Sequence, residues 1–102
     1  MLGFGMKSHN TSRIRARCIF SGTVQGVCFR YNTKKVSSGF DVAGFVRNLP
    51  DGTVEMVAEG ERAEVENFIS EVARRMGDYI RERTTEWGEC GGEFSGFDIR
   101  LY

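Results

Sequence analysis

The stretch GTVQGVCFR, residues 22–30, contains the residue types that could bind an anion. Gly22 and Gly26 allow backbone dihedral angles that turn successive N–H groups toward one point, which forms a concave anion-binding nest. A helix that begins at Phe29 would add the positive end of its dipole. Arg30, in the first turn of that helix, supplies a planar fork that matches phosphate or carboxylate oxygens. The stretch lacks the GxxxxGK[ST] pattern, which argues against a nucleoside triphosphate.

Cys28, in the same stretch, raises the possibility of a thiol nucleophile, because the positive end of a helix stabilises a thiolate. Cysteine-dependent phosphatases use a C-x5-R loop, however, and the sixth residue after Cys28 is Lys34. We therefore predict that Cys28 is a bystander. The three cysteines are widely spaced and odd in number, which argues against a disulfide framework and a zinc site. The only histidine, His9, lies in the polar N-terminal stretch, so any chemistry must proceed without histidine.

The hydrophobic pattern predicts the elements that position these residues. Strict alternation predicts a strand over residues 13–21, and apolar residues at helical spacing predict helices over 29–38 and 61–76. Further strands are predicted over 40–48, 53–60, 78–87 and 96–102. In the third strand Glu55 and Glu59 alternate with apolar residues, and in the last strand Phe97, Ile99 and Leu101 are expected to face inward.

This order, β-α-β-β-α-β with one extra strand, predicts an α+β fold of the ferredoxin-like, split-βαβ type. Its sheet is antiparallel, both helices cover one face, and the other face is open to solvent. A helical crossover joins the first two strands, so they run parallel with the third strand between them. Their carboxyl ends then lie about 10 Å apart at one edge of the sheet. Arg30 and Asn48 could therefore meet there over a small ligand.

Composition is that of one ordinary globular domain, with 40% hydrophobic and 27% charged residues. No apolar run approaches the roughly 20 residues of a membrane span, and the apolar stretch at the start is too short for a signal peptide. We therefore expect a cytoplasmic protein. Residues 1–48 carry eight Lys or Arg and one acid, whereas residues 49–102 carry six and thirteen. Either the acids form a solvated helix face by chance, or the first half binds an anion.

Three segments together resemble the acylphosphatase family: GTVQGVCFR, then GFVRNLPDGTVEMVAEG at residues 44–60, then FDIRLY at 97–102. The first two match the family signatures G-x-V-Q-G-V-x-F-R and G-[FYW]-[AV]-[KR]-N-x3-G-x-V. The similarity covers residues 13–102, taken as the acylphosphatase-like domain. Residues 1–12 extend beyond the usual start of the family and are expected to be a disordered extension. The region 77–95 matches no motif.

The resemblance implies a site and a reaction. Asn48 would hold the attacking water, and the side chain of Arg30 would bind the phosphoryl group with backbone N–H groups of the loop. Those N–H groups belong to Val24, Gln25, Gly26, Val27, Cys28 and Phe29. The reaction would convert small acyl phosphates to carboxylate and inorganic phosphate, in a monomer without cofactor, metal, nucleic-acid or membrane partner. Because these contacts all lie at the phosphoryl end, we expect weak selectivity among acyl groups.

Two alternatives remain open on the sequence. The first is an RRM-like module that binds single-stranded nucleic acid on the same fold, since GFV at 44–46 faintly resembles an RNP1 block. That block belongs on the third strand, however, and this stretch is on the second. The second alternative is the carbamoyl-phosphate-handling domain of a hydrogenase maturation factor, which has an acylphosphatase-like module.

Overall fold

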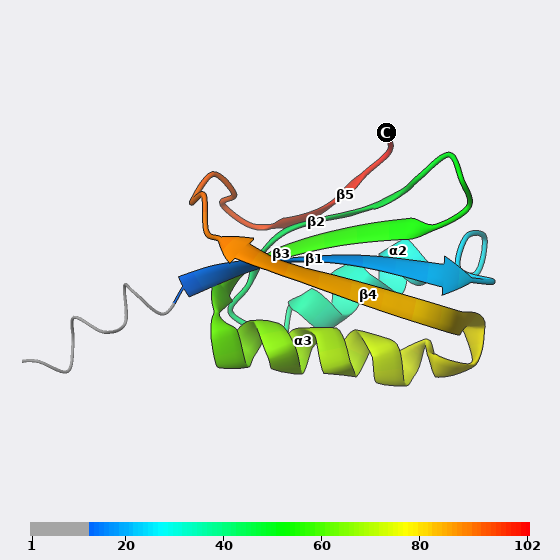
Figure 1. The fold of residues 1–102 in the computed structure, drawn as a ribbon, viewed down its shortest axis with the longest axis horizontal. Coiled ribbons are helices and arrows are strands. Elements are labelled where there is room, and N and C mark those ends of the chain that lie inside the picture. The colour runs from blue at the N-terminus through cyan, green and yellow to red at the C-terminus, as the bar shows by residue number, and fades with distance from the viewer. Residues whose placement is uncertain (1–12) are drawn as a thin grey trace, which may run out of the picture.

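The computed structural model describes residues 13–102, so the predictions for residues 1–12 and His9 lie outside the described residues. The elements, in chain order, are β1 (Arg13–Gly22), α2 (Phe29–Ser37), β2 (Ala43–Asn48), β3 (Val54–Glu61), α3 (Arg62–Arg75), the short 3-10 helix η1 (Gly77–Tyr79), β4 (Ile80–Glu89) and β5 (Phe97–Arg100). The predicted order of helices and strands is confirmed (Figure 1). No helix within residues 13–102 is long and apolar enough to cross a membrane.

The five strands form one sheet in the order β4-β1-β3-β2-β5. β3 lies between β1 and β2 and is antiparallel to both, so β1 and β2 run parallel, as predicted. β4 is antiparallel to β1 at one edge, and β5 joins the other edge parallel to β2. The first four strands thus form the antiparallel ferredoxin-like sheet, and the additional strand makes it mixed. Both helices lie on the same side of the sheet (Figure 1).

The core lies between that face of the sheet and the two helices. β1 contributes Ala16, Cys18 and Phe20, which alternate toward the helices and are buried. The predicted apolar stripe of α3 is buried against them, with Val65 and Phe68 fully inaccessible to solvent. Period-two and period-3.6 patterns therefore determine the layers, because each strand and helix has one apolar side to bury.

The opposite face is less open than the alternation predicts, because Glu55 and Glu59 of β3 are buried. Glu55 accepts hydrogen bonds from the Nε atoms of Arg17, at 2.5 Å, and Arg47, at 2.6 Å. Burial alone would raise the pKa of Glu55, but these two guanidinium groups outweigh it and lower the pKa below its ordinary value. The expectation of a solvated centre on this face is therefore wrong.

Glu59 is covered by the segment that connects β4 to β5. Its carboxylate accepts hydrogen bonds from the backbone N–H groups of Gly91, at 3.0 Å, and Gly92, at 3.1 Å, and from the thiol of Cys90. Phe94 of the same segment packs on Phe45 of β2, with ring centroids 5.8 Å apart. The region for which the sequence offered no motif thus crosses the sheet face and delivers the chain to β5.

Candidate active site

One hollow, of about 430 Å³, lies where the loop after β1 meets the end of β2. Figure 1 shows that loop and the β2–β3 turn at the same right-hand end of the molecule. The residues that line the hollow come from the loop, the start of α2, the end of β2 and the end of the chain: Val24, Gly26, Cys28, Phe29, Arg30, Tyr31, Asn48, Ile99 and Leu101. The structure thus brings the two predicted functional side chains, Arg30 and Asn48, into one hollow.

Strand register explains why these residues meet. Val54 of β3 pairs with Phe20 of β1 on one side and with Asn48 of β2 on the other. Two inter-strand spacings therefore separate Asn48 from the end of β1, which is about 10 Å. The loop that leaves β1 begins two residues beyond Phe20 and extends into this gap.

The backbone of the loop has the conformation of an anion-binding nest. Gly26 has a φ of 81°, and Cys28 has a φ of 62° although it is not glycine. Within residues 13–102, none of the backbone N–H groups of residues 24–28 donates to a backbone carbonyl. Cys28 occupies the N-cap of α2 without a side-chain hydrogen bond, and the first turn contains no acid. Unpartnered N–H groups and an uncapped helix start leave donors available for a bound anion.

The loop is held from below by the core. Val24 and Phe29 are buried, and the Phe29 ring packs on Phe20 with centroids 5.1 Å apart. Gly22 has a φ of 126°, and a Cβ there would come within 2.4 Å of the Tyr79 carbonyl oxygen, so only glycine fits. These contacts fix the nest before a ligand arrives, which is the preorganisation that electrostatic catalysis requires.

Gln25 adds a brace that the sequence reasoning missed, since only its backbone N–H had been considered. Its side-chain Nε2 donates to the carbonyl oxygens of Leu49, at 2.8 Å, and Thr53, at 2.9 Å. These carbonyls belong to the β2–β3 turn that follows Asn48. Gln25 therefore ties the loop to the segment that positions the carboxamide. No local sequence pattern could reveal the contact, because it joins residues more than twenty positions apart.

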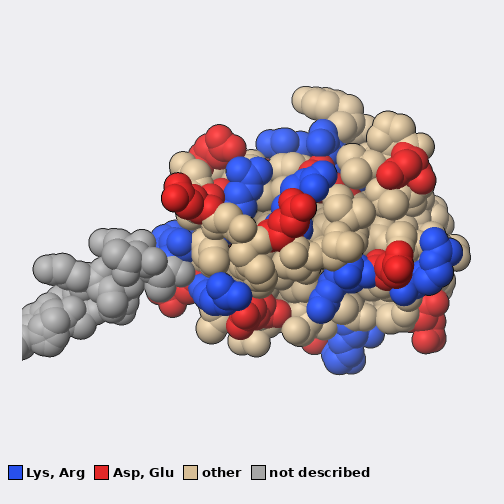
Figure 2. Space-filling view, viewed as in Figure 1, with Lys and Arg blue, Asp and Glu red and all other residues tan. Residues whose placement is uncertain are grey.

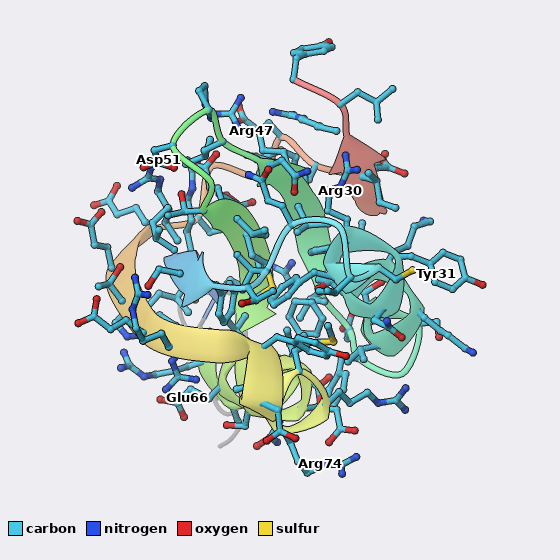
Figure 3. All side chains as sticks on the ribbon, turned by 90° about the vertical axis from the view of Figure 1, so that its right-hand side faces the viewer. Arg30, Tyr31, Arg47, Asp51, Glu66 and Arg74 are labelled. Carbon is cyan, nitrogen blue, oxygen red and sulfur yellow. The ribbon has the colours of Figure 1, made fainter. Side chains whose placement is uncertain are left out.

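Arg30 and Asn48 are both half-buried. Arg30 forms no ion pair with any charged residue among residues 13–102. Figure 3 looks onto this end of the molecule, where Arg30 lies beside the end of β5 and Tyr31 extends outward. By contrast, Arg47, next to Asn48, is engaged with Glu55. The cationic group left for a ligand in the hollow is thus the Arg30 guanidinium.

The three cysteines have different surroundings. Cys18 is buried in the core, Cys90 donates to Glu59, and Cys28 is exposed at the hollow. Within residues 13–102, no three His, Cys, Asp or Glu side chains are grouped so that they could hold a metal ion. The hollow itself contains no carboxylate.

Ile99 and Leu101 also line the hollow, although the sequence reasoning assigned them to the core. Phe97 is buried and Ile99 half-buried, as predicted, but 82% of Leu101 is exposed. The alternation places these side chains on the correct face, but β5 ends at Arg100 and Leu101 lies beyond the cover of α2. Leu101 is therefore a residue of the hollow rather than of the core.

The comparisons with known proteins agree on one family. The acylphosphatase family model matches residues 16–99. An acylphosphatase of Pelotomaculum thermopropionicum is 42% identical over 89 residues, which cover 86% of this chain and 97% of the relative. An acylphosphatase of Aeropyrum pernix is 41% identical over 98 residues, 94% of this chain and 97% of the relative. The crystal structure of acylphosphatase from Bacillus subtilis superimposes with a TM-score of 0.78 at 27% identity, covering 86% of this chain and 99% of that one. The chain belongs to the acylphosphatase family.

Proposed function

We propose that this chain hydrolyses the carboxyl–phosphate bond of small acyl phosphates in the hollow between the loop and β2. The reaction is R–CO–OPO₃²⁻ + H₂O → R–COO⁻ + H₂PO₄⁻. The observation that carries the proposal is that Arg30, Asn48 and a loop with unpartnered backbone N–H groups share one hollow. The acylphosphatases to which the chain is similar support the same reaction.

The loop and Arg30 bind the phosphoryl group. The transition state of phosphoryl transfer is loose, with charge spread over three equatorial oxygens. The N–H groups of residues 24–29 and the start of α2 face those oxygens, and the Arg30 guanidinium donates two parallel hydrogen bonds to them. Because the core and Gln25 hold the loop in place, little reorganisation is needed during the reaction.

Asn48 orients the attacking water, and the substrate supplies the remaining chemistry. The leaving carboxylate has a conjugate acid with a pKa of about 4, so it departs without a general acid. The phosphate oxygens accept the proton of the water, so no protein base is required. This explains how the hollow works without histidine or carboxylate. The reaction needs no metal or cofactor, because the loop and Arg30 supply the positive charge.

Cys28→Ser should retain near-wild-type kcat and KM with acetyl phosphate, because the backbone of residue 28, not its thiol, faces the phosphoryl group. Serine keeps the size and can occupy the same N-cap position. Steady-state kinetics of both proteins check this, with circular dichroism to verify folding. A folded but inactive serine variant would instead identify the thiol as a nucleophile.

The RRM-like alternative is not favoured by the sheet face. That alternative needs exposed aromatic side chains and a basic surface on the central strands. Here the central strand β3 presents Glu55 and Glu59, which are buried under arginines and the segment before β5. On the face shown in Figure 2, Lys and Arg lie interspersed with Asp and Glu and form no single basic area. The matches to acylphosphatases over nearly their whole length do not favour the maturation-factor alternative either.

The same proposal covers the setting in which the chain works. All residues of the hollow come from one chain, so a monomer is sufficient. Three free thiols suit the reducing cytoplasm. Nucleic acid and membrane play no part in the reaction.

Hydrolysis of benzoyl phosphate in ¹⁸O-water with EDTA tests the proposal. Attack on phosphorus predicts turnover that EDTA leaves unchanged, with the label in inorganic phosphate and none in benzoate. Label in benzoate would show attack at the carbonyl carbon, and loss of activity with EDTA would show a need for a metal. Either result contradicts the proposal, as does the absence of turnover by the folded protein.

A further inference from the structure

Exposed apolar side chains gather around the candidate active site. Among residues 13–102, four large hydrophobic side chains are strongly exposed: Tyr31 by 62%, Tyr79 by 43%, Leu101 by 82% and Tyr102 by 87%. Tyr31 and Leu101 line the hollow that contains Arg30 and Asn48. A second hollow, of about 510 Å³, adjoins it through Asn48 and Leu101 and is also lined by Tyr102. Exposed apolar surface that is concentrated at one hollow marks a binding surface.

Leu101 is held in this position by contacts on the opposite face of the sheet. Arg100 lies over the Phe45 ring, with its guanidinium carbon 3.9 Å from the centroid. Arg47 donates from Nη1 to the backbone oxygen of Tyr102 at 3.1 Å. Because side chains alternate along an extended chain, fixing Arg100 on one face directs Ile99 and Leu101 toward the other, where the hollow lies.

Strand register places Leu101 beside Asn48. β5 runs parallel to β2, with Ile99 opposite Val46 and Arg100 opposite Arg47. Continuing this register brings position 101 level with Asn48. Leu101 and Ile99 thus form an apolar wall, defined by these two residues, directly next to the carboxamide.

We propose that this apolar wall receives the hydrocarbon part of the acyl group, so that the enzyme prefers acyl phosphates with apolar or aromatic acyl groups. The inference rests on the proposed function and adds its substrate class. Arg30 and the loop account for the phosphoryl end of the substrate. The hollow, of about 430 Å³, is within the size range of sites that enclose a whole small molecule. Its remaining side chains toward the end of the chain are Ile99 and Leu101, which offer contact area without hydrogen-bonding groups.

This inference replaces the weak selectivity expected from the sequence. Selectivity then arises from apolar contact with the acyl group, whereas binding of the phosphoryl group is the same for every substrate. A benzoyl group places a full ring against the wall, and acetyl or carbamoyl groups place at most one small group there. We expect wild-type kcat/KM to favour benzoyl over acetyl and carbamoyl phosphate by roughly tenfold.

Leu101→Ala tests the wall. It should lower kcat/KM for benzoyl phosphate roughly three- to tenfold and leave that for acetyl phosphate within about twofold, because only the larger acyl group loses contact area. Inhibition by inorganic phosphate should stay unchanged. Leu101→Met, which keeps the apolar volume, should restore the benzoyl preference. Tyr79→Ala is the matched control, since Tyr79 is exposed but lines neither hollow.

The possible outcomes separate this inference from the proposed function. If wild-type protein hydrolyses neither substrate, both fail. If it hydrolyses both, and Leu101→Ala leaves the benzoyl-to-acetyl ratio unchanged or lowers both rates equally, the wall is overturned and the function stands. A dimer in light scattering that dissociates in Leu101→Ala, with the ratio unchanged, would assign the exposed leucine to self-association and would also overturn the inference.

Discussion

Arg30→Ala abolishes measurable hydrolysis of acetyl phosphate, with an expected loss in kcat/KM of roughly 10³-fold or more. In the hollow the other phosphoryl contacts are neutral N–H groups, so the Arg30 guanidinium supplies the only full positive charge there. The charge acts on both the bound substrate and the transition state, so inorganic phosphate binding should be lost as well. Steady-state kinetics and isothermal titration with phosphate measure the two effects.

Two further variants make the Arg30 result specific. Lys35→Ala removes a positive charge from the same helix outside this hollow and should have little effect on either measurement. Arg30→Lys keeps the charge but loses the planar fork, so we expect only partial activity. A folded Arg30→Ala enzyme with near-wild-type turnover would end the assignment of this residue.

Asn48→Ala should lower kcat roughly 10²- to 10³-fold while phosphate affinity stays within about twofold of wild type. The side chain of Asn48 is half-buried in the hollow, and it orients the water rather than the phosphoryl group. Removing it leaves Arg30 and the loop intact, so the ground state still forms but the nucleophile is no longer positioned. Single-turnover kinetics with acetyl phosphate and titration with inorganic phosphate separate the two effects.

The control for Asn48 exploits its charge. Asn48→Asp keeps the shape but introduces a negative group beside the phosphoryl oxygens, so it should lose phosphate affinity as well as turnover. Asn67→Ala, on the exposed side of α3, removes the same carboxamide far from the hollow and should be silent. If Asn48→Ala turned over acetyl phosphate at the wild-type rate, water orientation by this residue would be refuted.

The layers and the position of the site were predictable from local patterns. Alternation in residues 13–21 and the apolar stripe of α3 each define one side to bury, and the helical crossover after β1 makes β1 and β2 parallel. From that topology alone, Asn48 and the loop end at the same edge. The signature segments then identify which polar residues at that edge matter.

What could not be predicted depends on contacts between distant residues. Glu55 is buried because Arg17 and Arg47, from two other strands, close over it. Gln25 bridges to the β2–β3 turn, and Leu101 joins the hollow because Arg100 is held on the opposite face. Period-two alternation assigns a face to each of these side chains, but not the partner that it meets there. The same contacts explain part of the charge asymmetry, since basic groups of the first half pair with acids of the second.

The most direct test of the division of labour in the hollow is the dissociation constant of inorganic phosphate, measured side by side for wild type, Arg30→Ala and Asn48→Ala. If Arg30 and the loop hold the phosphoryl group while Asn48 holds the water, affinity falls by more than tenfold in Arg30→Ala and stays near the wild-type value in Asn48→Ala. Equal losses in both variants, or no loss in either, would contradict this assignment.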